Sequence, residues 1–551
     1  MEKIGSITAA SLSGGFKMRF IGEASPEALR LGQYLVIQGK VFRFLCMISD
    51  ISLSASQDQL TNLLVSQGFR GEQEVQSVLP TLLGRSLFVE TDLQPLKMIR
   101  HISENKTEIM DPKTIPPHLS EVRRAHEADV ADVFGKIDGE TLWPLGQPIG
   151  MDFTIPINVD RFLARSSGIF AISGAGKSFL AKILIGAIIG SKKGCVFVFD
   201  MHDEYGNYAI DEKKGTKTPG IKALFPDQTT LFTLDPSTFE KYDAVLVIGT
   251  EDISINDLLA LSNQIHLTDA QEGMLYQLKR GLGEGWLATL LNPDLLVSRE
   301  EMEQISEDTN VPMDSLRSIV RKFYFSLGRF KFIKPGKHAK KGIQKILGAL
   351  SKGTSVVLNF GKYKDDLSAY MLVSNLITRR IRDEYVENIN KRRQNPSLPE
   401  FPNLLIFIEE AHKFLDKQAA KWSVFNKIAR EMRKYKVALC IIDQRPSTID
   451  PDVMSQIWSR FIMTLADTRD IDAVLSGMKN ASNMKTVVYS LEQQEALCFG
   501  FAFPMPSTIR VVDFNPSLFG MWKSPLGESI TKTDESSKSP EDLLAEINAD
   551  L

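Results

Sequence analysis

The chain has 551 residues, of which 43% are hydrophobic and 24% are charged, and its formal net charge at pH 7 is −3. This length exceeds what one hydrophobic core usually organises, so we expect several domains, and any contact with nucleic acid must come from a local basic surface. No apolar run reaches the roughly 18 residues that cross a bilayer, and the N-terminus lacks a signal-peptide pattern, so we expect a cytoplasmic protein with no membrane contact.

The first hundred residues are rich in short β-branched and aromatic runs, such as GQYLVIQG and VFRFLCMISDISL. Glycine and serine separate these runs, which is typical of strands joined by turns. They predict a small β-barrel over residues 1–105. Proline punctuation in MDPKTIPPHLSEV predicts a linker over residues 106–140.

After residue 140, apolar strand-like runs alternate with helical patterns. The runs are GIFAIS, GCVFVFD, TSVVLNF, NLLIFIEE and VALCIIDQ. Apolar strands separated by helices indicate a parallel sheet covered on both faces, and hence an α/β core over residues 141–249 and 351–520. Residues 250–350 have helical patterns of mixed polarity and predict an inserted helical subdomain. Residues 521–551 form a C-terminal tail.

The stretch FAISGAGKSFL predicts a phosphate-binding loop of the form G-x-x-x-x-G-K-[ST], although Ala171 holds the first glycine position. Backbone N–H groups of such a loop surround the β-phosphate, while Lys177 supplies charge to the phosphates and Ser178 a hydroxyl to Mg²⁺. A strand before the loop and a helix after it supply the required context. The residues expected to contact the nucleotide are Ser173, Gly174, Ala175, Gly176, Lys177, Ser178 and Phe179.

Hydrolysis also needs acidic groups, and NLLIFIEEAHKF offers two at the end of an apolar strand. We expect Glu409 to hold a Mg²⁺ water shell and Glu410 to polarise the attacking water. The next strand ends in VALCIIDQRPSTIDPDV, which places Gln444 beside this acid pair, where an amide can sense the γ-phosphate. His412 receives no chemical role.

Three arginines are candidates for contact with the nucleotide of a neighbouring subunit. Arg430 and Arg433 lie three residues apart in NKIAREMRKYK, on one predicted helical face. Arg165 precedes the strand that leads into the phosphate loop, so it projects from the opposite end of that strand, away from its own nucleotide.

Two other classes of nucleotide-binding protein are disfavoured. SLSGG at residues 11–15 is similar to the signature of ABC transporter ATPases, but it precedes the phosphate loop instead of following it. It is better interpreted as a glycine turn between two barrel strands. The N-K-x-D element that reads guanine does not occur in the order expected of a GTPase.

The ordered motifs resemble those of the HerA family of hexameric DNA translocases, relatives of the FtsK pumps, over nearly the whole chain. The residues that carry the resemblance are Arg165, the phosphate loop, FDMHDEY, IEEAH, AREMRKYKVAL and QRPSTIDPDV. The resemblance implies a RecA-like core in which Lys177 and Ser178 bind ATP and Mg²⁺ and Glu410 is the catalytic acid-base. It also implies that Arg165, with Arg430 or Arg433, acts on the adjacent subunit's nucleotide, and that Gln444 is a sensor.

Three positions depart from the family pattern: Ala171 replaces a glycine, Asp203 replaces the glycine of D-x-H-G-E-Y, and Asp443 replaces a serine or threonine before Q-R-P. We expect these departures to affect the rate of ATP turnover more than nucleotide binding. The resemblance implies a homohexamer that acts on DNA with a separate effector, a nuclease or a sirtuin-like NAD-cleaving enzyme, in DNA-end processing or anti-phage defence. A second hypothesis is a hexameric scaffold whose ATPase gates an effector without processive translocation.

Two basic stretches are candidates for contact with DNA. The first, DEKKGTKTPGIK, contains Lys213, Lys214, Lys217 and Lys222, and the second, residues 321–341, mixes eight Lys or Arg residues with aromatics. The tail SSKSPEDLLAEINADL carries capping residues and an apolar stripe that predict a short helix. We expect this helix to clasp the adjacent subunit of the ring.

Overall fold

The computed structural model describes residues 3–20, 26–55, 87–103, 106–210, 217–237, 241–338, 342–416 and 423–523. The chain divides into two compact units. The first comprises Met1–Asn158, Phe170–Gly176 and Ser459–Asp513, and the second comprises Val159–Ile169, Lys177–Trp458 and Phe514–Leu551. Within the described ranges, no helix combines the length and apolar character needed to cross a membrane. The clasp expected in the tail lies outside the described residues.

The N-terminal part of the first unit is a closed antiparallel barrel. Its sheet has the order β2-β1-β7-β3-β4-β5-β6, and an additional pairing of β2 with β5 closes the strands from β2 to β5 into a ring. The expected small barrel is therefore confirmed. The region interpreted as a linker contributes β6 and β7, whose short polar sequences gave no strand signal. The strands are β1 Lys3–Ser11, β2 Gly15–Phe20, β3 Tyr34–Gln38, β4 Arg43–Ala55, β5 Leu87–Ser103, β6 Lys106–Met110 and β7 Glu121–Arg124.

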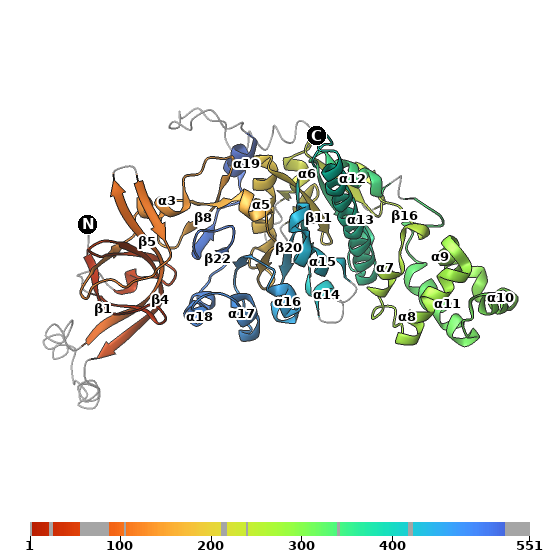
Figure 1. Ribbon diagram of the computed structural model, residues 1–551, viewed down its shortest axis with the longest axis horizontal. Helices are drawn as coiled ribbons and strands as arrows, with labels where there is room; N and C mark the ends of the chain where they lie inside the picture. The colour runs from red at the N-terminus through yellow and green to blue at the C-terminus, as the bar shows by residue number, and fades with distance from the viewer. Residues whose placement is uncertain are drawn as a thin grey trace. The chain divides into compact units, whose positions relative to one another are not determined.

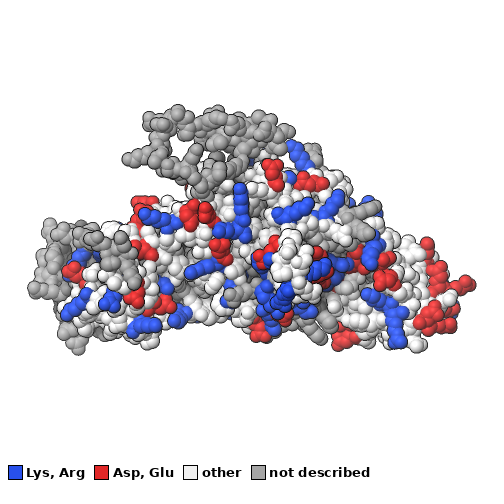
Figure 2. All heavy atoms as spheres, turned by 45° about the horizontal axis from the view of Figure 1, so that its top comes forward, with Lys and Arg blue, Asp and Glu red and all other residues white. Residues whose placement is uncertain are grey.

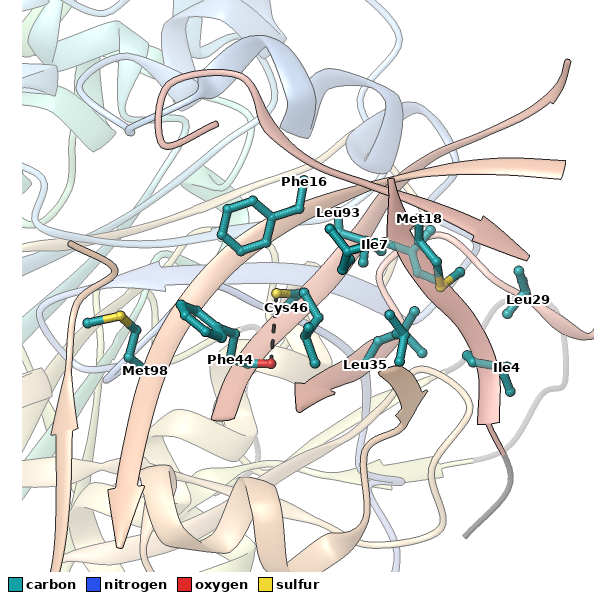
Figure 3. Close-up of a cluster of buried hydrophobic side chains, with 13 residues drawn as sticks. Ile4, Ile7, Phe16, Met18, Leu29, Leu35, Phe44, Cys46, Leu93 and Met98 are labelled. Atoms are coloured by element: carbon teal, nitrogen blue, oxygen red, sulfur yellow. Dashed lines mark hydrogen bonds between the residues drawn. The ribbon is translucent and has the colours of Figure 1, made fainter. Parts of the chain in front are cut away.

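Alternating side chains of these strands fill the barrel interior, as Figure 3 shows. Phe44, Cys46 and Ile48 share one face of β4 because successive side chains of a strand point to opposite faces. The rings of Phe16 and Phe44 meet edge to face with centroids 5.9 Å apart. The Cys46 Sγ donates to the Phe44 carbonyl at 3.9 Å, so the thiol is both buried and bonded.

Five further strands of the first unit form an antiparallel arrangement in the order β21-β22-β23-β8-β9. Within this unit the Nδ2 groups of Asn480 and Asn483 donate to Gln94 Oε1 of β5 at 3.2 and 3.4 Å, which ties the barrel to the C-terminal strands. The elements are β8 Leu142–Pro148, β9 Ile155–Asn158, β21 Ser459–Ile462, β22 Glu495–Gly500, β23 Ser507–Val511, α3 Glu127–Phe134, α17 Thr468–Leu475 and α18 Ala481–Tyr489.

The second unit is built on a parallel sheet in the order β15-β14-β18-β11-β19-β20-β10. Neighbouring strands from β15 to β20 pair in parallel, and every apolar run predicted as a core strand is one of the strands of this sheet. The predicted α/β core with a parallel sheet is confirmed. The strands are β10 Ser167–Phe170, β11 Gly194–Asp200, β14 Thr229–Thr233, β15 Ala244–Val245, β18 Ser355–Asn359, β19 Asn403–Glu409 and β20 Val437–Asp443.

Helices flank this sheet, and the longest of them, α13, lies beside α12 (Figure 1). Helix α19 packs on α5 at Gly186, where a Cβ atom would stand 2.5 Å from the Trp522 ring. Only a residue without a side chain permits this approach. The helices are α4 Val159–Leu163, α5 Lys177–Ser191, α6 Ile221–Leu224, α12 Ile343–Ser351, α13 Leu367–Gln394, α14 His412–Leu415, α15 Val424–Glu431, α16 Pro451–Met454 and α19 Pro516–Lys523.

Between β16 Ile248–Gly249 and β17 Ile333–Lys334 the chain forms the expected helical insertion. The helices of the insertion pack through apolar faces. The exposed face of α10 is acidic, and its acidic side chains appear as red spheres at the right of Figure 2. Helix α12, in the last part of the region predicted as the insertion, packs on the core strand β18. The helices are α7 Ile255–Leu259, α8 Asp269–Leu282, α9 Trp286–Leu290, α10 Arg299–Thr309 and α11 Met313–Leu327.

The barrel core generates a stability prediction. We expect Phe16→Ala to destabilise the barrel by about 3–5 kcal/mol, because Phe16 is fully buried and its loss leaves a cavity. Leu53→Ala is the matched control, since Leu53 is 87% exposed on the same barrel. Thermal unfolding and limited proteolysis measure both variants. Equal midpoints for the two would contradict the described core.

Candidate active site

The phosphate loop joins β10 to α5 and has the backbone that its glycines permit. Gly174 and Gly176 have φ values of +79° and +107°, which side chains rarely adopt, and Ala171 is fully buried at the strand exit. The carbonyl oxygens of Gly174 and Ala175 accept from Gln493 Nε2 at 3.1 Å and from the Gln494 N–H at 3.4 Å. These bonds hold the two carbonyl oxygens away from the inside of the loop. This orientation suits a loop whose backbone N–H groups bind an anion.

Helix α5 begins at Lys177, so the charge of this lysine adds to the positive end of the helix. Burial lowers the Lys177 pKa, while the carboxylates of Glu409 and Glu410 act in the opposite direction. Ser178 is half-buried and the next residue, Phe179, is 40% exposed. The first turn of the helix therefore presents an ammonium group, a hydroxyl and an aromatic ring.

Glu409 ends β19 and is almost fully buried, at 8% exposure. The Tyr205 hydroxyl donates to its Oε1 at 3.0 Å, and the Tyr370 hydroxyl donates to its backbone carbonyl at 3.0 Å. Burial, with the nearby charges of Glu204 and Asp200, raises the pKa of Glu409 to about 8. Several carboxyl groups thus gather where parallel strands end. The two tyrosines were not expected from the sequence, although FDMHDEY contains Tyr205.

The described residues contain no group of three or more His, Cys, Asp or Glu side chains arranged to hold a metal ion, so a cation here would depend on Glu409 together with a bound nucleotide. Among the described residues, no hydrogen bond reaches Glu409 Oε2, although this atom is buried. A buried carboxylate that lacks a donor is costly, and a cation close to it removes that cost. Glu409 and Ser178 are the residues that would hold Mg²⁺, by water or directly, together with phosphate oxygens.

Glu410 has a φ of +50°, a left-handed conformation that costs a non-glycine residue roughly 1–3 kcal/mol. This bend ends the strand and turns the Glu410 side chain away from the buried position of Glu409. Gln444 Nε2 donates to Glu410 Oε1 at 3.2 Å, so the structure brings together the acid and the amide expected from the sequence. Lys413 Nζ lies 3.7 Å from Glu410 Oε2.

Asp443, one of the departures from the family pattern, organises the turn after β19. Its buried carboxylate accepts from the His412 backbone N–H at 2.7 Å, from His412 Nδ1 at 3.0 Å and from the Arg445 N–H at 2.6 Å. The hydrogen bond to Asp443 raises the pKa of His412. The ion pair fixes the segment that carries Glu410, which is a positioning role that the sequence did not reveal.

Asp203, a second departure, has a φ of +61°, which explains why a glycine is usual at this position. Aspartate tolerates this conformation better than most residues, and Asn359 Nδ2 donates to its Oδ1 at 2.9 Å. Beside it, Asp200 accepts from the backbone N–H groups of Glu204, Tyr205 and Gly206 at 2.8 to 3.1 Å. The turn therefore keeps its shape without the glycine.

The three arginines lie in different elements. Arg430 is in α15 and pairs at the surface with Asp452 at 3.2 Å, while Arg433 is in the following 3₁₀ turn, Met432–Tyr435. Arg165 lies before β10, at the end opposite the phosphate loop, and its guanidinium Cζ is 4.0 Å from the centre of the Trp458 ring. Arg165 is therefore separated from the phosphate loop of its own chain by the length of β10.

Several side chains of the two basic stretches make contacts inside the protein and do not form a surface open to nucleic acid. Lys222 Nζ donates to the Thr229 carbonyl at 2.9 Å and pairs with Asp243 at 3.0 Å, whereas Lys217 is exposed. In the second stretch Phe323, Phe330 and Phe332 are buried, so these rings are core residues and are not available to stack on bases. Lys213, Lys214 and residues 339–341 lie outside the described part of the chain.

Comparison with known families identifies this architecture. Residues 143–381 match the family model described as the central domain of helicase HerA. These residues form a HerA-type domain. The family resemblance and the expectation of a P-loop ATPase are thereby confirmed, and the match begins with β8 and includes the phosphate loop, the FDMHDEY turn and the helical insertion.

Several curated proteins that are similar to this chain are called DNA double-strand break repair helicase HerA. One from Saccharolobus solfataricus is 26% identical over 428 residues, which cover 77% of this chain and 78% of the relative. One from Sulfurisphaera tokodaii is 24% identical and covers 87% of this chain and 97% of the relative. Among solved structures, VirB4 of Thermoanaerobacter pseudethanolicus aligns at 14% identity with a TM-score of 0.46, over 68% of this chain and 97% of that one.

The His412–Asp443 pair generates a prediction of pH dependence. Because the folded pKa of His412 lies above its unfolded value of about 6.5, the pair stabilises the fold fully below that pH, and its contribution disappears as pH rises through the folded pKa. We expect His412→Gln to lower the melting temperature more at pH 6 than at pH 9. Thermal melts across this range measure the effect.

The exposed residue His118 supplies the control for this experiment, since His118→Gln removes an imidazole without removing a buried ion pair. A melting-temperature deficit of His412→Gln that is the same at both pH values would show that the charge of the imidazolium is not involved.

Proposed function

We propose that the chain is an ATP-hydrolysing, homohexameric DNA translocase or helicase of HerA type that works with a separate effector protein. The observation that carries this proposal is the convergence of Lys177, Glu409, Glu410 and Gln444 at the carboxyl ends of parallel strands, in a chain whose residues 143–381 match a HerA-type domain. The relatives named as DNA break repair helicases support DNA as the substrate.

Each residue of the site has a task in this reaction. The loop from Ser173 to Gly176 binds phosphate through its amides, and Lys177 neutralises charge on the transferred group. Glu410 orients the attacking water and accepts its proton, because its carboxylate lies half-exposed beside Gln444. Gln444 links the state of Glu410 to the presence of the γ-phosphate. Mg²⁺, held with Ser178 and Glu409, would neutralise phosphate charge.

The hexamer follows from the need for an arginine at the nucleotide. Arg165, Arg430 and Arg433 are the candidates for a finger donated by the adjacent subunit, since Arg165 precedes β10, at the end opposite the phosphate loop, and Arg430 lies at the surface beside Asp452. An arginine supplied in trans makes hydrolysis in one subunit depend on the position of the next, which is what ordered movement around a ring requires. The effector is a nuclease or an NAD-cleaving enzyme.

A scaffold that gates an effector without processive translocation is the second candidate. The burial of Phe323, Phe330 and Phe332 and the internal bonds of Lys222 favour it, because they remove contacts that were candidates for DNA. The two functions share the ATPase site and differ in the response to DNA.

One prediction from the proposed function separates ATP binding from ATP hydrolysis. We expect Lys177→Ala to lose tight ATP binding, because it removes phosphate charge. We expect Glu410→Gln to keep ATP affinity within about twofold while kcat falls by on the order of 10³-fold, because only water activation is lost. Binding of a fluorescent ATP analogue and phosphate release measure the two effects. Lys352→Ala, which removes a lysine at the helix α12 C-terminus, is the control.

The second prediction separates the motor from the scaffold. We expect DNA to raise the ATPase rate, and the rate at saturating DNA to increase with duplex length up to a plateau, as processive movement requires. Duplexes of different length at equal mass concentration measure this dependence. An ATPase rate that ignores DNA and rises only with the purified effector favours the scaffold.

A further inference from the structure

Tyr370 is a buried residue of α13 that contacts the chain on both sides of Glu410. Its hydroxyl donates to the carbonyl of Glu409, directly before Glu410, at 3.0 Å. Its ring lies edge to face against Phe414, four residues after Glu410, with the ring centroids 5.2 Å apart. Tyr370 is 0% exposed, and the proposed mechanism gives its hydroxyl no task.

The tyrosine is itself held in place at the start of α13. Its backbone N–H donates to the Asp366 carbonyl at 3.0 Å in the first turn of the helix. The Asp366 side chain caps this turn by accepting from the N–H groups of Ser368 and Ala369 at 3.0 and 3.2 Å. A second ring, that of Phe360, packs edge to face on the tyrosine with the centroids 5.1 Å apart. The helix turn and the two rings restrict the tyrosine side chain, so its hydroxyl is a donor in a fixed position.

The hydrogen bond to the Glu409 carbonyl acts on Glu410 because these two residues share one peptide unit. The carbonyl of Glu409 and the N–H of Glu410 lie in one plane. The φ angle of Glu410, +50°, is a rotation away from that plane which a side chain disfavours. A peptide unit with a free carbonyl can rotate to relieve this strain, whereas the hydroxyl of Tyr370 opposes the rotation.

Other bonds hold the backbone after Glu410. The Glu410 carbonyl accepts from the Lys413 N–H at 2.9 Å, and Asp443 accepts from the His412 N–H at 2.7 Å. The tyrosine hydroxyl acts on the peptide unit before Glu410, so the bend is held on both sides. The Glu410 carboxylate thereby keeps the direction in which Gln444 Nε2 donates to it at 3.2 Å.

We infer that Tyr370 is a positioning residue whose hydroxyl fixes the backbone of Glu410, and thereby the direction of the Glu410 carboxylate toward the attacking water. This inference rests on the proposed function, since it requires Glu410 to act on that water. Tyr370 is buried and touches no reacting group itself. Its effect on hydrolysis passes through the placement of Glu410, where an error of about 1 Å costs up to about 100-fold in rate.

The test removes the hydroxyl and keeps the ring. We expect Tyr370→Phe in the full-length protein to lower the single-turnover rate of ATP hydrolysis by about 10- to 100-fold, because Glu410 loses its fixed direction. The Kd of a fluorescent ATP analogue should change less than about twofold, because Lys177 and the phosphate loop are unaltered. The same analogue counts the ATP-binding sites, and the rate is expressed per site so that unfolded protein does not contribute.

Tyr385→Phe is the matched control, because Tyr385 is buried in the same helix. Its ring lies 5.2 Å from that of Phe401, which precedes β19, whereas Glu409 ends that strand. We expect this variant to hydrolyse ATP within about twofold of the wild-type rate. Equal losses in Tyr385→Phe and Tyr370→Phe overturn the inference, and so does a wild-type rate in Tyr370→Phe. If Tyr370→Phe binds no analogue, Tyr370→Met replaces it with the same expected loss.

A double substitution distinguishes action through Glu410 from a general effect on the core. In a Glu410→Gln background, Tyr370→Phe should cause no further loss of the single-turnover rate, because the carboxylate that the tyrosine directs is absent. Losses that multiply in the double variant overturn the inference.

The outcomes also separate this inference from the proposed function. A wild-type rate in Glu410→Gln overturns the proposed task of Glu410 and the positioning role of Tyr370 together. A loss on the order of 10³-fold in Glu410→Gln, together with an unchanged rate in Tyr370→Phe, leaves the proposed function in place and rejects only the positioning role.

Discussion

The crowding of carboxyl groups at the ends of β11 and β19 is the constraint on which the site depends. Asp200 and Glu409 are both buried there, and burial raises the pKa of the first to about 7 and of the second to about 8. Such a cluster is costly unless donors and cations compensate for it. The Tyr205 hydroxyl, three consecutive backbone amides and the ammonium of Lys177 supply part of this compensation.

The same constraint explains why adjacent acids behave differently. Glu409 completes a strand and points into the cluster, while the left-handed backbone of Glu410 releases the next side chain toward Gln444. In the proposed mechanism one carboxyl group holds a cation and the other acts on water, although they are neighbours in sequence. The strain at Glu410 is maintained by the bonds that Asp443 makes to His412 immediately after it.

The sequence predicted the core strands, the phosphate loop and the pairing of Glu410 with Gln444, because each depends on local pattern and on strands ending at one edge. It did not predict β6 and β7, whose sequences KTEIM and EVRR carry no apolar alternation and become strands only by pairing. It did not reveal Tyr205 and Tyr370 as partners of Glu409, because contacts across long separations leave no local signal. The aromatics of residues 321–341 were ambiguous for the same reason.

Helices α19 and α5 pack closely against each other at Gly186. Trp522 rests where Gly186 leaves room, and its ring also lies 6.0 Å from that of Phe514. Helix α19 therefore packs directly against the helix that begins with Lys177. A substitution that adds a side chain at Gly186 would therefore force α19 and the helix that begins with Lys177 apart, although Gly186 lies in the middle of α5 and not in the phosphate loop.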